Sequence, residues 1–292
     1  MKRKKHAYLI MAHGSWGQLE QLLSLLDDKR NDIFLHIDIK AKDVDLSRFQ
    51  RSIQCSELYF IKSRNVTWGG DSQIKVELDL IECAVRQHRY DYLHLLSGVD
   101  LPIKSKDYIF RYFEENNGKE FVMIDRENDN KTAIERVNYH YFFQNKIGRN
   151  PNGLLNKIQS TIIKVESLFR YSRNSREFLS KLHKGPNWFS ITGSFAKYIV
   201  SKREWIDQHF KYTFCADEVF MQTLLFESPF KDNVYVNDNL KYTHLRLTDW
   251  QRGNPYTWQN EDLGFLLDSP YLFARKFDTV NDTYIYEQIK KL

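Results

Sequence analysis

The chain has 292 residues, of which 42% are hydrophobic and 28% charged, and its formal net charge is +5. Aromatic residues are abundant at 15%, whereas Gly (12) and Pro (6) are few. This composition excludes a disordered tail protein, a collagen-like chain and a low-complexity linker. A chain of this length can bury a substantial core, either as one large domain or as two ordinary ones.

The start of the chain and its cysteines bear on the cellular compartment. The apolar run at 7–12 has six residues, whereas a membrane span needs about 20. The basic residues before it resemble the start of a signal peptide, but the run is too short and ends at His13. The three cysteines (Cys55, Cys83 and Cys215) lack metal-type spacing. Their odd number argues against a disulfide scaffold and favours a reducing compartment.

Predicted strands and helices alternate through the N-terminal half. The predicted strand regions are 7–12, 33–38, 58–61 with 66–68, and 91–96, and the predicted helices are 16–26 and 72–88. Strands separated by helices of this length predict βαβ units and a mostly parallel sheet, so the expected fold class is α/β. No Gly-rich phosphate-binding loop occurs.

Short polar sequences follow the predicted strands. They are His13-Gly14-Ser15, Asp38 and Ser97-Gly98-Val99-Asp100. In open α/β sheets, ligands bind at the carboxyl ends of the strands. We therefore expect a ligand site where these sequences meet.

Basic residues are concentrated in one segment. Residues 146–184 hold nine Lys/Arg and two Glu, a net charge of +7, so the other 253 residues sum to −2. A helix is predicted there by apolar residues that recur every three or four positions: Leu154, Leu155, Ile158, Ile162, Val165, Leu168 and Phe169. Two interpretations stay open: a solvated helix face, or an amphipathic surface over 154–183 that meets anionic lipid or a polyanionic acceptor. Nucleic acid is not expected, because no nucleic-acid motif accompanies the segment.

A metal site is not expected. The D-x-D sequence Asp43-Val44-Asp45 lies five residues beyond a predicted strand, and we interpret it as the start of a short helix. The sequence contains neither HExxH nor CxxC.

Two adjacent acids, Asp217 and Glu218, precede a predicted apolar helix. Acids in a first helical turn favour the helix dipole, which is a purely structural interpretation. Alternatively, a carboxylate set among Phe214, Val219 and Phe220 would have a raised pKa and could act as a general base.

Two basic elements follow towards the C-terminus. Residues 245–250 predict a strand end from which Arg246 points outward, and residues 273–278 set Arg275 and Lys276 between aromatic residues. Each alone is also typical of a surface cation with a buried stem. A carboxylate base with converging cations suits a reaction in which a hydroxyl is activated while cations stabilise a departing diphosphate.

In these motifs the chain resembles glycosyltransferase family 14, the group of core-2/I-branching β-1,6-N-acetylglucosaminyltransferases and peptide O-xylosyltransferases. The resemblance covers nearly the whole chain in eight blocks: 10–14, 35–38, 67–70, 92–104, 187–189, 217–220, 245–250 and 273–278. The last two blocks look closer to the xylosyltransferase branch.

The resemblance implies a GT-A-like, Rossmann-like fold, a UDP-sugar co-substrate, and inversion at the anomeric carbon with neither metal nor other cofactor. It implies that Glu218 deprotonates the acceptor hydroxyl. It further implies that Arg246 and Lys276, with Arg275, hold the diphosphate of UDP.

The resemblance also implies two sets of binding residues. The nucleoside and donor set is Ala12, His13, Asp38, Thr67, Trp68 and Asp100. The sugar and acceptor set is Asn187, Trp188, Asp217 and Trp250. Asp100 stands where metal-dependent relatives carry a D-x-D motif, but it supplies a single carboxylate.

The resemblance implies a single glycosyltransferase domain over 1–292. Within it, 1–125 is the expected nucleotide-binding half, 126–186 a basic helical insertion, and 187–292 the acceptor and catalytic half. Asn187 stands where the xylosyltransferases carry an acidic residue, which bears on whether the donor carries xylose or N-acetylglucosamine.

The animal members of the family are cysteine-rich and membrane-anchored, whereas this chain has three cysteines and no predicted anchor. It therefore resembles a bacterial, cytoplasmic relative that builds a cell-surface glycan or exopolysaccharide. Its expected acceptor is a lipid-linked glycan, met at the inner face of the cell membrane through 154–183. The alternative left open is a non-catalytic carbohydrate- or polyanion-binding module, favoured by the aromatic content and the basic segment.

Overall fold

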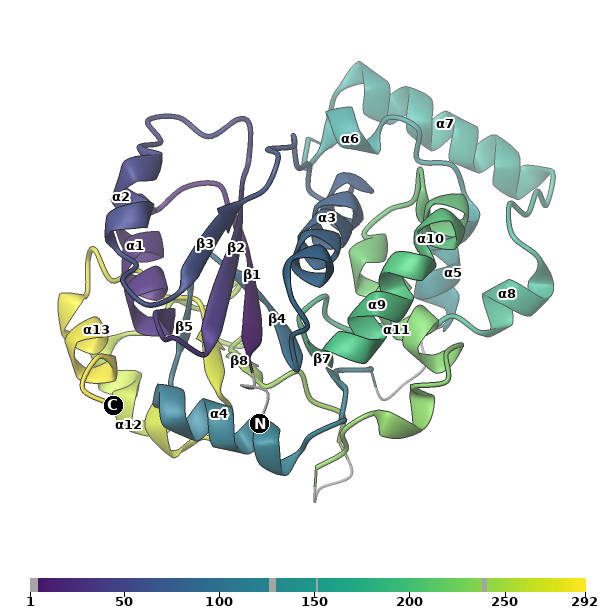
Figure 1. Ribbon diagram of the computed structural model, residues 1–292. Coiled ribbons are helices and arrows are strands. Elements are labelled where there is room, and N and C mark those ends of the chain that lie inside the picture. The colour runs from purple at the N-terminus through teal and green to yellow at the C-terminus, as the bar shows by residue number, and fades with distance from the viewer. Residues whose placement is uncertain (1–4, 126–129, 151, 238–240) are drawn as a thin grey trace.

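The computed structural model describes residues 5–125, 130–150, 152–237 and 241–292 (Figure 1). The strands are β1 (His6–Ala12), β2 (Asn31–Ile37), β3 (Glu57–Phe60), β4 (Tyr92–Ser97), β5 (Asp100–Pro102), β6 (Phe121–Val122), β7 (Phe189–Thr192), β8 (Arg246–Thr248) and β9 (Phe273–Arg275). The α-helices are α1 (Trp16–Leu26), α2 (Leu46–Arg51), α3 (Ser72–Gln87), α4 (Lys106–Glu115), α5 (Asn130–Asn138), α6 (Gln144–Ile147), α7 (Leu154–Leu168), α8 (Arg176–Ser180), α9 (Gly193–Ser201), α10 (Arg203–Phe210), α11 (Phe220–Phe226), α12 (Leu263–Asp268) and α13 (Thr283–Ile289). The 3-10 helices are η1 (Ala216–Glu218), η2 (Lys231–Asn233) and η3 (Asn260–Asp262).

The central sheet has the strand order β3-β2-β1-β4-β7-β6. The pairings from β3 to β4 are parallel, and β7 runs antiparallel to both β4 and β6. Strands β1 and β2 are almost continuous buried runs, as expected where helices cover both faces of a sheet. The predicted α/β class with a mostly parallel sheet is confirmed.

Alternate side chains of β1 enter two different hydrophobic cores, because successive residues of a strand point to opposite faces. Ala7 and Leu9 pack in the core that contains residues of α3 and α9. Tyr8 and Ile10 pack in the other core, with residues of α1 and α13. Figure 1 shows these helices on the two sides of the sheet.

The predicted helices 16–26 and 72–88 form α1 and α3, and the basic helix forms α7. The D-x-D sequence precedes α2, where the Asp45 carboxylate accepts the backbone N–H of Ser47 (3.0 Å) as an N-cap. The interpretation of that sequence as a helix start is confirmed.

Residues 66–68 do not form the predicted strand region; only its first part is a strand, β3. They enter a turn in which the Gly70 N–H bonds to the Thr67 carbonyl (3.0 Å). Gly69 has φ +72°, and a Cβ at this position would lie 2.9 Å from the ring of Phe214. A side chain is therefore excluded at the residue after Trp68, which fixes the approach of this turn to the segment before η1.

A second small sheet has the order β5-β9-β8 and joins distant parts of the chain. In its register Asp100 lies opposite Arg275. The sheet thereby brings the C-terminal cations to the segment that follows β4. Across the described ranges, no helix has the length and apolar character needed to cross a bilayer.

Candidate active site

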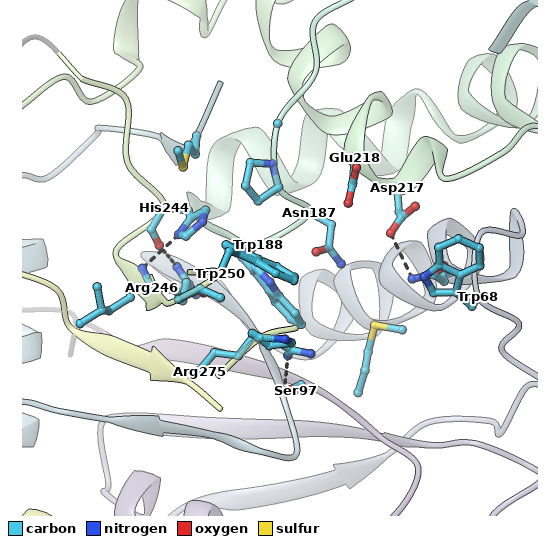
Figure 2. Close-up of a pocket in the computed structure, with 18 of the residues that line it drawn as sticks. Trp68, Ser97, Asn187, Trp188, Asp217, Glu218, His244, Arg246, Trp250 and Arg275 are labelled. Carbon is cyan, nitrogen blue, oxygen red and sulfur yellow. Dashed lines mark hydrogen bonds between the residues drawn. The ribbon is translucent and has the colours of Figure 1, made fainter. Parts of the chain in front are cut away.

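A cavity of about 1500 Å³ lies at the carboxyl ends of the central strands (Figure 2). It is lined by Ala12 and His13 at the end of β1, by Asp38 after β2, and by Ser97 at the end of β4. A cavity therefore lies where the ligand site is expected. The volume exceeds the roughly 300–1,000 Å³ of a typical small-molecule pocket.

The cavity brings together most of the predicted site residues. Those that line it are Ala12, His13, Asp38, Trp68, Asn187, Trp188, Asp217, Glu218, Arg246, Trp250 and Arg275. Thr67, Asp100 and Lys276 lie outside the lining.

Glu218 lies in η1, and its side chain is 40% exposed at the cavity wall. Its Oε2 accepts a hydrogen bond from Arg136 Nη1 at 2.5 Å, and its backbone carbonyl accepts from the N–H of Gly185 (2.9 Å). These contacts fix the carboxylate while its exposed part faces the cavity. The sequence carries no signal for Arg136, which comes from α5, 82 residues earlier.

Asp217, the neighbour of Glu218, is buried and bonds to Gln73 Nε2 (3.1 Å). Burial, with a further contribution from the charge of Glu218, raises the pKa of Asp217 to about 7. The sequence predicts a raised pKa for a carboxylate in these apolar surroundings. Asp217 has such a raised pKa.

Behind Asp217 lies a second carboxyl group that the sequence analysis missed. Glu77 of α3 is fully buried, and Asn187 Nδ2 donates to its Oε1 at 3.4 Å. Burial, followed by the charge of Asp217, holds the pKa of Glu77 well above its usual range. Glu77 Oε2 and Asp217 Oδ1 have no hydrogen-bond partner among the described residues. Glu77 could have been noticed as an acid at a core position of the predicted helix 72–88.

Arg275 lines the cavity, and contacts with neighbouring residues fix its side chain there. Its Nη1 donates to Ser97 Oγ (2.6 Å) and to Asp100 Oδ1 (3.2 Å), and its guanidinium lies 4.6 Å from the Trp188 ring centroid. Asp100 is fully buried and also accepts the backbone N–H of Ser97 (2.8 Å). Asp100 therefore acts on the site through Arg275 rather than by lining the cavity.

Arg246 differs from the prediction that it points outward from a strand end. The side chain is 2% exposed and donates to Ser190 Oγ (2.7 Å) and to the carbonyl of Leu95 (3.1 Å). Its guanidinium also lies 4.9 Å from the Phe273 ring centroid. Burial lowers the pKa of Arg246 to about 9. The outward prediction is wrong because these acceptors belong to β7 and β4 of the central sheet, so the guanidinium is directed into the protein, although the residue still borders the cavity.

Further cations line the cavity without belonging to any predicted motif: Lys40, Arg149, Lys184 and Lys241. The guanidinium of Arg149 lies 5.2 Å from the Trp68 ring centroid, and Lys184 forms an ion pair with Asp125. Two of the four, Arg149 and Lys184, come from the basic segment 146–184. Part of that charge therefore faces the cavity.

Asp38 organises the loops at the other end of the cavity. Its carboxylate accepts the backbone N–H groups of Lys40 (2.8 Å) and Val66 (3.2 Å). Thr67 instead donates through Oγ1 to the carbonyl of Asn145 (2.9 Å), which explains why it lies outside the lining. Trp68, 44% exposed, presents its indole to the cavity. In the described ranges, no three His, Cys, Asp or Glu side chains are grouped to hold a metal ion.

The fold and cavity define an α/β protein with a ligand site at the strand ends. Residues 6–264 match the Core-2/I-Branching enzyme family, and the chain belongs to this family. The GT-A-like fold expected from the resemblance agrees with the observed α/β arrangement.

Two relatives indicate the breadth of the family. Xylosyltransferase 2 of Bos taurus is 24% identical over 306 residues, covering 97% of this chain and 33% of that protein. The N-acetyllactosaminide beta-1,6-N-acetylglucosaminyl-transferase of Homo sapiens is 24% identical over 291 residues, covering 93% of this chain and 68% of that protein. The chain thus spans about a third of the length of the xylosyltransferases it matches.

Among solved structures, mouse xyloside xylosyltransferase 1 in its apo form aligns with a TM-score of 0.40 at 11% identity. The alignment covers 93% of this chain and 97% of that chain.

Proposed function

We propose that this protein is an inverting glycosyltransferase that moves a sugar, N-acetylglucosamine or a xylose-like residue, from a UDP-sugar to a glycan hydroxyl without a metal ion. One observation carries the proposal. The cavity sets Glu218 across from Arg275, with Trp188 between them (Figure 2). An acceptor base and a leaving-group cation are the two parts that a single displacement needs.

In the proposed reaction the Glu218 carboxylate takes the proton of the acceptor hydroxyl. The hydroxyl oxygen attacks the anomeric carbon from the face opposite the diphosphate, and the bond from that carbon to the diphosphate oxygen breaks. UDP leaves with the bonding electron pair, so the configuration at the anomeric carbon inverts. Arg275 stabilises the negative charge that develops on the diphosphate.

The remaining cations take lesser parts in this proposal. Arg246 adds positive potential from beneath the cavity, since its Nη1 and Nη2 donate to protein acceptors. Lys276 follows Arg275 in the chain but lies outside the lining, so we assign it an indirect role. Asp100 replaces a metal-binding motif by holding Arg275 at the end of β4.

The donor and acceptor are assigned to opposite ends of the cavity. The nucleoside is proposed to lie by Ala12, His13 and Asp38. Their side-chain or backbone oxygens can accept hydrogen bonds from the ribose hydroxyls. Trp68 offers a flat ring at the same end. Trp250, 65% exposed, is proposed to carry the acceptor sugar.

The transferred sugar is proposed to lie between Trp188, Asn187 and Asp217. Asn187 carries an amide where the resemblance expects an acid in the xylosyltransferases, and this amide is held by Glu77. An amide donor suits an N-acetyl carbonyl, so we favour N-acetylglucosamine as the transferred sugar.

The acceptor is proposed to be a cell-surface or exopolysaccharide glycan, extended in the cytoplasm on a lipid-linked precursor. The described cysteines are all free thiols, which is compatible with a reducing compartment.

The proposal is tested by screening a panel of UDP-sugars for UDP release with soluble glycan acceptors, with and without EDTA, and by titrating UDP in a calorimeter. We expect UDP to bind equally with and without EDTA, and one UDP-sugar to release UDP in both conditions. Loss of binding and turnover in EDTA would contradict the metal-independent mechanism. Glycan binding with no binding of UDP would favour the non-catalytic module.

A further inference from the structure

Helix α7 presents a row of apolar side chains to solvent. Leu154, Leu168 and the C-cap residue Phe169 are 73%, 78% and 77% exposed. Leu155, Ile158, Val165 and Tyr171 are exposed as well. Single exposed apolar residues are normal on a protein surface, but a contiguous set marks an interaction site.

The helix is held to the protein by its polar side. Gln159 is the buried residue of α7, and its amide accepts from the N–H of Phe143 (2.9 Å) and donates to Gln144 Oε1 (3.2 Å). Glu166 accepts the backbone N–H of His140 (3.0 Å) and contacts its ring nitrogen (2.7 Å). A surface helix of a globular protein normally packs its apolar side against the protein and turns its polar side to solvent, which is the opposite of α7.

Basic side chains flank the exposed row. Lys157 and Lys164 are exposed and lie seven residues apart, two helical turns, so they share one side of α7. Arg170 follows the helix and is exposed too. By contrast, Arg173 and Lys181 of the same basic segment bond to other parts of the protein.

We propose that α7 and residues 169–171 bind the surface of an anionic lipid bilayer. The apolar row enters the boundary of the acyl chains while Lys157 and Lys164 meet the anionic head groups, as in other interfacial helices. A second copy of the chain fits less well, because an antiparallel two-fold contact through this row would bring the lysines of both copies to the same side of the interface. The charge of the row's border therefore selects lipid over a second copy.

This orientation also places the bilayer relative to the two ends of the cavity and, in that respect, rests on the proposed function. Arg149 lines the cavity beside Trp68 and precedes the first residue of α7 by five positions, at most ~18 Å of extended chain. In Figure 1, α6 and α7 lie together at one end of the molecule. A bilayer at α7 therefore lies near the Trp68 end of the cavity, the end proposed above for the nucleoside.

The proposal is tested by co-sedimentation with vesicles of phosphatidylcholine alone and vesicles in which about a third of the lipid is phosphatidylglycerol. The full chain is compared with Leu168→Ser/Phe169→Ser and with Lys157→Gln/Lys164→Gln. We expect binding to the anionic vesicles that weakens with salt, and a loss of roughly tenfold or more in each double variant.

Matched controls distinguish binding through the apolar row from non-specific adsorption to the vesicles. Phe265→Ser on α12 removes an aromatic side chain that is 60% exposed, and Lys29→Gln/Lys231→Gln removes two exposed lysines elsewhere. Both should bind vesicles like the unmodified chain, and circular dichroism should show all variants folded. Absence of binding to anionic vesicles, equal binding by the α7 variants, or self-association that the α7 variants abolish would each overturn the proposal.

Discussion

Two arginines at the cavity differ in what surrounds their guanidinium groups. Arg275 reaches the cavity from Asp100 and Trp188, whereas Arg246 is enclosed by protein acceptors. The same substitution should therefore have different consequences at the two positions.

We expect Arg275→Ala to weaken UDP binding by about 1.5–3 kcal/mol, the range for a charge-assisted hydrogen bond. Arg246→Ala should instead lower the free energy of unfolding by about 2–4 kcal/mol, because it empties a buried site and removes the hydrogen bonds to Ser190 Oγ and the Leu95 carbonyl. Calorimetric UDP titration and denaturant unfolding separate the two effects, with Lys276→Ala as the comparison. Unchanged UDP binding in Arg275→Ala would remove the diphosphate role of Arg275.

The buried carboxyl groups Glu77 and Asp217 make stability depend on pH. Burial raises both pKa values from ordinary values of 4.5 and 3.8, to about 7 for Asp217. At a pH between the ordinary and the raised pKa values, the folded protein keeps protons that the unfolded chain has released. The free energy of unfolding therefore falls as the pH rises from about 4 towards 7.

Glu77→Gln removes one of these groups and should stabilise the protein at pH 8, while leaving stability nearly unchanged at about pH 4. Denaturant unfolding at the two pH values measures the difference. The exposed Glu261→Gln serves as the control and should change neither value. A Glu77→Gln effect of the same size at both pH values would contradict the assigned protonation.

Motifs identified Glu218, Arg275 and Trp188 from the sequence, but not the residues that hold them. Arg136 and Glu77 contact the site from α5 and α3, at sequence separations of 82 and 110 residues. Such contacts depend on how helices pack around the sheet. No local pattern encodes them.

At the scale of elements, long apolar runs and long periodic segments were the most predictable. The strands β1, β2 and β4 are long apolar runs, and α1 and α3 have clear helical periodicity. Strand β8 has three residues, too few for an alternating pattern to show which way Arg246 points.

Helix α7 illustrates a different limit. Its periodicity predicted the helix and its amphipathic character, but not which side faces the protein. Gln159 and Glu166 decide this through hydrogen bonds to Phe143 and His140, near α6. The apolar side remains exposed as a result.

Over the whole molecule, the basic residues behind the net charge of +5 lie in separate places. In the basic segment, Arg149 and Lys184 belong to the cavity wall, and Lys157 and Lys164 border the exposed row of α7. The distribution of charge therefore suggests two anionic partners, a nucleotide sugar and a lipid surface.

The architecture also explains why the site needs the full length of the chain. The central sheet supplies one edge of the cavity through β1, β2 and β4. The small sheet adds Arg275, and η1 adds Glu218. The proposed base and the proposed leaving-group cation thus come from segments that meet only in the folded protein.

The most direct test of the proposed reaction is Glu218→Gln, measured for both UDP binding and turnover with the sugar donor found in the screen. The amide keeps a hydrogen-bond acceptor for Arg136 but cannot take the proton of the acceptor hydroxyl. We expect UDP affinity within about twofold of the unmodified protein and turnover lower by roughly 10²–10⁴-fold, whereas Glu261→Gln should change neither. Turnover that survives in Glu218→Gln at close to the original rate would show that this carboxylate is not the base.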